Sequence, residues 1–493
     1  MNRQVRRVAA VLLMFFLVLF AAPLYWQVLA ADRVSGDPRN ARLIIKEYSI
    51  ERGEMVLADG GTPVARSVPS KSGDALKFQR EYPFGDRYGM ITGYDSLVYG
   101  RSLAESEFNS FLLGKAPEQF AQNFIDLVTA RPNPGGTLVL TLNRKAQEAA
   151  EQQLGNRKGA VVALDPATGA VLAMTTFPRY DPNAFTSHDT TTVIKNWNQL
   201  VKDPNQPLLN RAAGGLYPPG STFKVITTAA ALENGHQPNE QRPNEQTYTP
   251  PQTTKAIQNF GGENCAPGQA TLSMADALRI SCNTFYAHLG VDLGAGKLVG
   301  EAEKFGLDSP SPFQLPGAAE SSIPTNLDPP ATAQSAIGQR DVRVSPLQMA
   351  QVAATIANGG RRMAPYVVSR VVDSEDASKV IKRFDPQPVG QVIPSGVADQ
   401  LKAMMGLVVS SGTGTSAQIP GLTVSGKTGT AQHGTGVAPH AWFIGFTSQG
   451  SKSIAVAVVV EDGGNLGSEA TGGAVAAPIA KKVMEAYLGI NGG

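Results

Sequence analysis

The chain has 493 residues, enough for two or three domains with a large enclosed core, which excludes a peptide hormone or a mini-protein. Hydrophobic residues make up 42% of the chain and charged residues 17%, a balance typical of folded proteins rather than disordered or fibrous ones. The 43 Lys and Arg residues nearly balance the 41 Asp and Glu residues. This balance argues against nucleic acid as the main partner, because phosphate binding requires concentrated positive charge.

The amino terminus predicts a single membrane anchor. Residues 8–26 are apolar, and no charged residue occurs between Arg7 and Asp32, so a helix here could span about 30 Å of hydrocarbon. The charged residues before the run are all basic, and the positive-inside tendency then makes residues 1–31 a cytoplasmic tail and anchor, with the rest of the chain outside. These residues are Arg3, Arg6 and Arg7. A cleaved signal peptide is the alternative, because residues 28–30 resemble a small-residue cleavage site.

Turn-rich residues divide the remainder of the chain into two predicted domains. Residues 131–136 are rich in Pro and Gly, so we place a small, extended, non-catalytic domain at 32–136 and a second domain at 137–493. In the second domain, apolar runs around turn residues predict antiparallel hairpins over 160–175 and 440–461, with helical stretches between them. This order predicts an α+β fold with a central antiparallel sheet and a helical subdomain.

Cysteine and histidine are too scarce to indicate metal chemistry or a histidine base. The two cysteines, Cys265 and Cys282, lack the repeated CxxC spacing of a zinc site. The five histidines contain no HExxH pattern. We therefore expect no metal and no cofactor, and a catalytic base other than histidine if the chain is an enzyme.

One helix start places a serine and a lysine on the same face. Ser221 follows a Pro-rich turn and opens an apolar helix, and Lys224 lies three residues further on, within reach of the Ser221 hydroxyl. A helix that is apolar on all sides is buried, and burial lowers the pKa of a lysine, so a neutral Lys224 could take the serine proton. The alternative is an N-cap serine with a solvated lysine, because Ser-X-X-Lys is common by chance.

Two further segments carry residues suited to the same chemistry. Ser281, Cys282 and Asn283 fall in a break between two helical stretches, where a hydroxyl and an amide can project from a loop. A helix cap is the alternative interpretation of these residues. Residues 427–430 precede the second hairpin and predict an edge strand, in which Gly429 lets another backbone approach closely.

The three segments, in the order SxxK, SxN and KTG, resemble the penicillin-binding proteins and serine β-lactamases. The resemblance covers nearly everything from Arg52 to Leu488, and it implies the serine β-lactamase and penicillin-binding transpeptidase fold. The region before Thr137 is too short for a glycosyltransferase domain, so the chain resembles class B, transpeptidase-only proteins. Among these it is most similar to the penicillin-binding protein A type of actinobacteria. It departs from the common pattern at Cys282, where Asp is more usual.

The resemblance implies a role for each matching residue. Ser221 would attack the carbonyl between the two terminal D-alanines of a wall stem peptide, with Lys224 as general base. Ser281 would relay the proton to the departing D-alanine. The backbone N–H groups of Ser221 and Thr430 would form the oxyanion hole. The substrate would be bound by Asn283, Lys427, Thr428, Gly429 and Thr430.

The implied activity is that of a peptidoglycan D,D-transpeptidase, which cross-links stem peptides, releases terminal D-Ala and is acylated by β-lactams. A D,D-carboxypeptidase and a β-lactam-binding division scaffold with little turnover are the alternatives. The implied partners are stem peptides, β-lactams, the cell membrane, and division or wall-synthesis proteins. The implied location is the cell membrane, with one span, a cytoplasmic N-terminus and an extracytoplasmic catalytic domain.

Two other enzyme classes fit the sequence less well. Residues 421–428 satisfy the G-x-x-x-x-G-K-[ST] pattern, but a P-loop follows a buried strand and opens a helix, and neither flank fits. A hydrolytic β-lactamase is disfavoured by the chain length, the anchor and the lack of a convincing deacylating glutamate.

On the predicted topology Cys265 and Cys282 lie outside the membrane, where a disulfide can form; two buried free thiols are the alternative.

Overall fold

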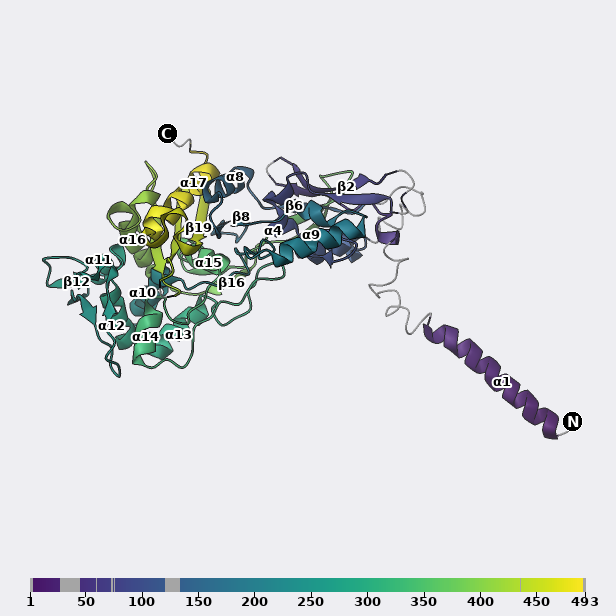
Figure 1. Ribbon diagram of the computed structural model, residues 1–493, viewed down its shortest axis with the longest axis horizontal. Helices are drawn as coiled ribbons and strands as arrows, with labels where there is room; N and C mark the ends of the chain where they lie inside the picture. The colour runs from purple at the N-terminus through teal and green to yellow at the C-terminus, as the bar shows by residue number, and fades with distance from the viewer. Residues whose placement is uncertain are drawn as a thin grey trace.

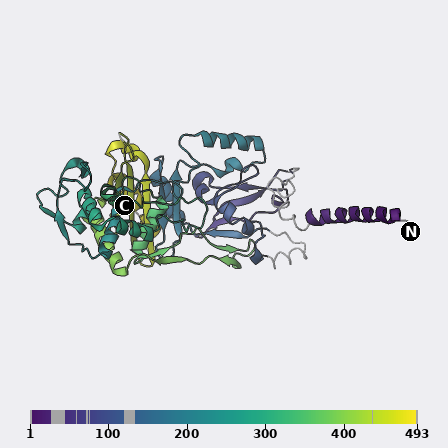
Figure 2. The same cartoon turned by 90° about the horizontal axis from the view of Figure 1, so that it is seen from below.

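The computed structural model describes residues 3–26, 45–58, 60–71, 74, 76–119, 134–434 and 436–490. The joint predicted at 131–136 lies partly outside these residues. Beyond the amino-terminal helix, two lobes lie side by side in both views (Figure 1 and Figure 2). The larger lobe is built on a five-stranded sheet and the N-terminal lobe on a six-stranded sheet.

The amino-terminal helix α1 (Arg3–Leu24) has 22 residues, none of which is buried. In the part of the chain that the structure describes, it is the one helix long and apolar enough to cross a membrane. The apolar run and its length therefore agree with the helix predicted for the anchor.

Five antiparallel strands form the central sheet of the larger lobe, in the order β17-β18-β19-β7-β8. The predicted hairpins correspond to β7–β8 and β18–β19, and the strand that carries residues 427–430 lies at the edge, as predicted. The α+β fold is thereby confirmed. The strands are β7 (Gly159–Leu164), β8 (Val171–Phe177), β17 (Ser425–Ala431), β18 (His440–Gln449) and β19 (Lys452–Val460).

Helices cover both faces of this sheet. In β19, Val456 and Val458 join the core formed with α8 (Arg144–Leu154) and α17 (Ala477–Leu488). The residues between and after them, Ala457 and Val459, join the core on the opposite face, which includes α15 (Pro346–Ala357). Because both faces are covered, the strand is an uninterrupted apolar run rather than an alternating one.

The helical subdomain lies between the two hairpins in the sequence. It includes η5 (Gly220–Phe223), α10 (Lys224–Glu233), α11 (Met274–Arg279), α12 (Asn283–Leu293), α13 (Ala295–Lys304), α14 (Pro329–Ala336) and α16 (Ser395–Ser411). Short strands connect these helices: β9 (Gln241–Pro243), β10 (Thr247–Tyr248), β11 (Ile257–Gln258), β12 (Thr271–Ser273), β13 (Arg361–Met363) and β16 (Pro388–Gln391).

The N-terminal lobe contains a second sheet, in the order β15-β14-β6-β1-β2-β3. Its strands are β1 (Met55–Leu57), β2 (Pro63–Pro69), β3 (Phe78–Glu81), β6 (Thr137–Leu140), β14 (Val368–Val372) and β15 (Val380–Arg383). Strand β6 pairs in parallel with β1 and antiparallel with β14. The predicted boundary at residue 137 separates β1, β2 and β3 from β6, β14 and β15, although all six strands form one sheet. Every residue of β6 is buried, and this strand pairs with a neighbour on each side.

Short elements complete the N-terminal lobe, and α9 packs beside it through an aromatic cluster that joins Tyr94, Phe185 and Trp197. The sequence did not predict α9. These elements are β4 (Asp95–Ser96), β5 (Gly100–Arg101), α4 (Gly89–Thr92), α5 (Leu103–Glu107), α6 (Asn109–Leu112) and α9 (Thr190–Lys202).

A buried ionic network stabilises the N-terminal lobe. The Glu105 carboxylate accepts hydrogen bonds from Nε of Arg52 and Nε of Arg80, each at 2.6 Å. Burial alone would raise the pKa of Glu105, but the two guanidinium groups lower it below its ordinary value. All three side chains are at most 5% exposed, so each charge depends on the others for compensation.

We expect Glu105→Gln to destabilise the protein by about 3–5 kcal/mol, because it leaves two buried guanidinium groups without a counter-charge. The measurement is the thermal unfolding of the full chain in detergent, followed by circular dichroism. The matched control is Glu81→Gln, which removes an ion pair with Arg66 whose side chains are 39% and 44% exposed. We expect this control to cost at most about 1 kcal/mol. Equal losses in the two variants would contradict the role of the buried network.

Candidate active site

Ser221 and Lys224 lie on one continuous turn, since η5 leads directly into α10. Ser221 is partly exposed, whereas Lys224 is fully buried. Nζ of Lys224 donates to the Ser281 carbonyl oxygen at 2.7 Å and to Oδ1 of Asn283 at 2.8 Å. Both residues are described, and no hydrogen bond joins this amine to the Ser221 hydroxyl. The Lys224 amine is therefore hydrogen-bonded to the segment that carries Ser281 and Asn283.

Lys427 brings the third segment to the same point. Its side chain is fully buried, and Nζ donates to Oγ of Ser281 at 2.8 Å and to the carbonyl oxygen of Thr428 at 3.0 Å. Nζ of Lys224 lies 3.4 Å from the same Ser281 hydroxyl. Two lysine amines, from a helix and an edge strand, therefore converge on one hydroxyl group.

Burial lowers the pKa of both lysines. The pKa of Lys224 falls well below its ordinary value, first because the amine is buried and second because the positive charge of Lys427 is close. Burial lowers the pKa of Lys427 to about 7. Within the described residues, neither amine pairs with a carboxylate that would restore its charge. An amine with a lowered pKa has a lone pair available near neutral pH, which is what a general base requires.

The middle segment forms the break between α11 and α12. Ser281 has a φ of 64°, a left-handed conformation that is uncommon for a residue with a side chain. Asn283 is held from both ends, because its side-chain amide donates to the Gln258 carbonyl oxygen at 3.0 Å and its backbone N–H donates to Oδ1 of Asn259 at 3.1 Å. The Asn283 oxygen thereby points to Lys224.

A disulfide joins Cys265 to Cys282. Cys282 is 2% exposed and lies between Ser281 and Asn283, so the bond attaches this segment to the preceding loop.

Close backbone contacts clamp the turn that carries Ser221. A Cβ on Gly429 would lie 3.0 Å from the carbonyl oxygen of Pro219, which is the close approach that the sequence predicts for this edge strand. On the other side, the N–H of Gly220 donates to the Gly338 carbonyl oxygen at 2.9 Å. A Cβ on Gly338 would lie 2.1 Å from the Gly220 carbonyl oxygen, so a larger residue cannot fit there.

The two threonines of the edge strand differ in their surroundings. The hydroxyl of Thr428 is 2.6 Å from the hydroxyl of Thr413, whereas Thr430 is partly exposed.

Sequence reasoning missed Thr413 and Asn259, which orient predicted site residues, and Tyr286, whose ring centroid lies 5.6 Å from Nζ of Lys224. Only the glycines on either side of Thr413 marked it as a turn, and no short motif marked the other two.

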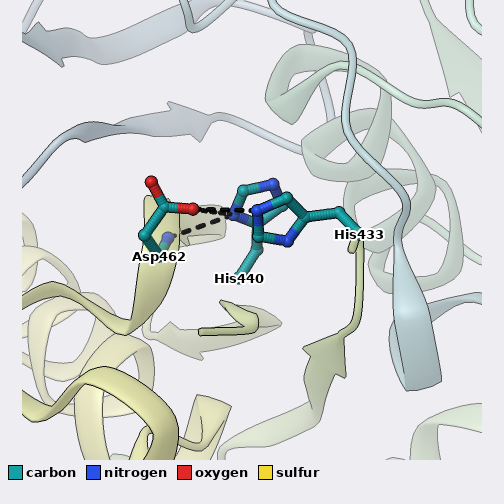
Figure 3. A group of neighbouring side chains, drawn as sticks. All are labelled: His433, His440 and Asp462. Carbon is teal, nitrogen blue, oxygen red and sulfur yellow. Dashed lines mark hydrogen bonds and ion pairs between the residues drawn. The ribbon is translucent and has the colours of Figure 1, made fainter. Parts of the chain in front are cut away.

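One side-chain group could hold a metal ion, contrary to the expectation from the sequence. His433, His440 and Asp462 converge beside the edge strand, with one ligand atom of each within 4.8 Å of the others (Figure 3). The sequence did not indicate this group because its members have no metal-binding spacing and come together only through the pairing of β17, β18 and β19.

Comparison with known proteins places the chain in a family. The family described as penicillin binding protein transpeptidase domain matches residues 159–485, and the one described as penicillin binding protein A dimerisation domain matches residues 52–138. The peptidoglycan D,D-transpeptidase PbpA of Mycolicibacterium smegmatis is 40% identical over 496 residues and that of Mycobacterium tuberculosis is 39% identical over 500 residues; each alignment covers 99% of both chains.

Solved structures agree with the sequence comparison. The ceftriaxone acyl-enzyme complex of penicillin-binding protein A from M. tuberculosis aligns with a TM-score of 0.84 at 38% identity, over 90% of this chain and 100% of that chain. The resemblance inferred from the three motifs is thereby confirmed. The chain belongs to the penicillin-binding proteins, as a class B member of the penicillin-binding protein A type with a transpeptidase domain.

Proposed function

We propose that this chain is a peptidoglycan D,D-transpeptidase that cross-links stem peptides through an acyl-enzyme at Ser221, releases terminal D-Ala and is acylated by β-lactams. The observation that carries the proposal is the convergence of the Lys224 and Lys427 amines on the Ser281 hydroxyl, with Lys224 one helical turn after Ser221. The names of the relatives and the β-lactam acyl-enzyme of the similar structure support the same activity.

In the proposed acylation, Oγ of Ser221 bonds to the carbonyl carbon between the two D-alanines, and the bond from that carbon to the terminal D-Ala nitrogen breaks. Lys224 takes the serine proton, and its lowered pKa supports this role. In the substrate-free arrangement the amine is bonded to Asn283 and the Ser281 carbonyl, and such sites often tighten only when substrate binds.

The proton then returns to the leaving group through Ser281. Its hydroxyl lies 3.4 Å from Nζ of Lys224, which supports a path from the base to the departing D-Ala nitrogen. The amine of a second stem peptide next attacks the acyl carbon and forms the cross-link. The bond from that carbon to Oγ of Ser221 breaks, and the amine proton passes back through the same groups to Oγ. Attack by water at this stage would give carboxypeptidase trimming instead.

The remaining residues bind the substrate in this proposal. The Asn283 amide contacts the donor backbone, and protonated Lys427 attracts the terminal carboxylate with help from the Thr430 hydroxyl. The Thr428 hydroxyl, which is bonded to the Thr413 hydroxyl, contributes to substrate binding together with it. Gly429 lets the strand lie close to the Ser221 turn.

The backbone N–H groups of Ser221 and Thr430 form the proposed oxyanion hole. The contact between these backbones supports the assignment, since a Cβ on Gly220 would lie 2.9 Å from the Thr430 carbonyl oxygen.

The proposed topology places residues 1–31 as a cytoplasmic tail and anchor, and both the non-catalytic part 32–136 and the catalytic part 137–493 outside the membrane. Strands β6, β14 and β15 of the catalytic part complete the sheet of the N-terminal lobe. The exposed apolar surface of α1 and its three N-terminal arginines support this orientation. The membrane and division or wall-synthesis proteins are the partners that such a position implies.

We expect the full chain in detergent to form a long-lived adduct of one drug molecule with penicillin, and Ser221→Ala to form none, because that variant lacks the side-chain oxygen that forms the ester. Intact-mass spectrometry measures both. An adduct lost within seconds would favour a hydrolytic lactamase, and no adduct on the parent would favour a scaffold. With a donor peptide ending in D-Ala-D-Ala and a D-amino acid acceptor, a product lacking the acceptor would indicate a carboxypeptidase.

We expect the second-order acylation rate constant to have a bell-shaped pH profile. The rate rises with pH as Lys224 loses its proton, at a pH well below the ordinary lysine range because the pKa is lowered. It falls above pH 7, since Lys427 with a pKa of about 7 then loses the charge that binds the carboxylate. Stopped-flow acylation at constant ionic strength measures the profile. Lys427→Arg keeps its charge at all these pH values, so an unchanged alkaline limb in this variant would contradict the assignment.

We expect the parent to contain no free thiol when it is denatured without reductant, and Cys265→Ser to contain one. The bond closes a loop with a sequence separation of 17, so its loss should cost roughly 3 kcal/mol of stability in the chain-entropy model. Thiol titration and thermal unfolding measure the two effects. Two free thiols in the parent purified from an oxidising compartment would rule out the disulfide.

A further inference from the structure

The side chains of His433, His440 and Asp462 converge on one point beside the edge strand. Nε2 of His433 lies 2.9 Å from Oδ1 of Asp462, and Nδ1 of His440 lies 3.7 Å from the same oxygen (Figure 3). This is the one group of three potential metal ligands at such spacing in the part of the chain that the structure describes.

Two imidazoles and one carboxylate form a donor set that is typical of zinc sites with an open coordination position. Tetrahedral zinc with bonds of about 2.0–2.1 Å places neighbouring ligand atoms roughly 3.3 Å apart. The separations of the two histidine nitrogens from Oδ1 of Asp462, 2.9 and 3.7 Å, lie on either side of this value, and all three ligand atoms lie within 4.8 Å of one another. We infer that His433, His440 and Asp462 form a zinc site, whose fourth ligand is water.

The site would join three segments that frame the catalytic strand. His433 follows β17 in the connection to β18, His440 is the first residue of β18 and pairs with Ala431, and Asp462 follows β19. An ion here would fix the β17–β18 connection, three residues after Thr430, to the end of β19.

A second set of contacts links the site to the nucleophile turn. Glu461 accepts hydrogen bonds from Arg211 Nε and the Tyr217 hydroxyl, each at 2.8 Å. The Tyr217 ring contacts the His440 ring edge to face, with centroids 5.5 Å apart. Tyr217 lies four residues before Ser221, so the zinc ligands are joined through one residue to the segment that positions the serine.

Zinc must replace existing interactions. The Asp462 N–H donates to Nδ1 of His440 at 3.2 Å, and the two imidazole rings are stacked with centroids 3.7 Å apart. The lone pair of each imidazole lies in the plane of its ring, and one ion cannot lie in both of two stacked planes, so at least one ring must rotate to face the ion. His433 and Asp462 have the freedom to do so, because their side chains are 24% and 53% exposed.

The inference is independent of the proposed function, because metal binding is measured without substrate. We expect the full chain in detergent, stripped with chelator and dialysed against zinc, to retain one ion per chain by elemental mass spectrometry. His433→Ala and Asp462→Asn should each weaken zinc binding more than about 100-fold, since losing even an outer-shell partner costs 10–100-fold. The matched control is His236→Ala, whose histidine pairs only with Glu240 and should leave binding unchanged.

Two further measurements separate a zinc site from a structural role of the same residues. Cobalt should give the visible absorption of a tetrahedral complex in the parent and not in His433→Ala, and zinc should raise the unfolding temperature of the parent but not of this variant. Ser221→Ala should bind zinc like the parent, which separates this site from the acyl-enzyme chemistry. Failure of the parent to retain zinc, or equal retention in both ligand variants, would overturn the inference.

Discussion

The structure buries two lysine amines around one serine hydroxyl, and the described residues supply no carboxylate to pair with either of them. Two unpaired ammonium groups in a buried site are mutually destabilising, so at least one amine must be neutral at ordinary pH. Burial lowers the pKa of Lys224, and the nearby charge of Lys427 lowers it further, so these surroundings favour the neutral form of this amine. This lowered pKa is what supports the proposal that Lys224 acts as the catalytic base.

Such a site depends on backbones that approach more closely than side chains allow. Gly429 and Gly338 both lie against the Ser221 turn: a Cβ would clash at Gly338 and would be in tight contact with its neighbours at Gly429. The edge position of β17 matters for the same reason, because one side of the strand pairs with β18 while the other remains free to face the turn. Helix α10 continues directly from the Ser221 turn, and α16 packs against both α10 and β17, so packing supports the turn as well as hydrogen bonds.

Sequence patterns predicted those parts of the structure in which local signals and global packing agree. The two hairpins carried turn residues between apolar runs, and α15 and α17 each had Pro near their first position. By contrast, α14 and α16 were missed, although α14 begins with an Asp328 cap and two prolines. The six-stranded sheet could not be foreseen at all, because β6, β14 and β15 join it from distant parts of the chain and no local pattern encodes that pairing.

The same distinction holds in the site. Ser221, Lys224, Ser281 and Lys427 were identified because motifs name them, whereas Asn259 and Thr413 act only on other residues. The group of His433, His440 and Asp462 could not be predicted for a further reason. Asp462 lies 29 residues after His433 and 22 after His440, and it comes near them only when β18 and β19 pair.

Cys282 illustrates how the structure resolves a departure from the family pattern. Cys282 follows the left-handed Ser281, and its buried side chain forms the disulfide with Cys265. The adjacent groups that face the amines are unaffected: the Ser281 carbonyl accepts from Lys224, and Asn283 remains fixed by Asn259. Left-handed backbone at a non-glycine residue costs about 1–2 kcal/mol, and it persists only where neighbours hold it. The covalent link and the Asn259 hydrogen bonds provide that restraint, so the exchange of Asp for Cys changes how the segment is anchored rather than what it presents to the substrate.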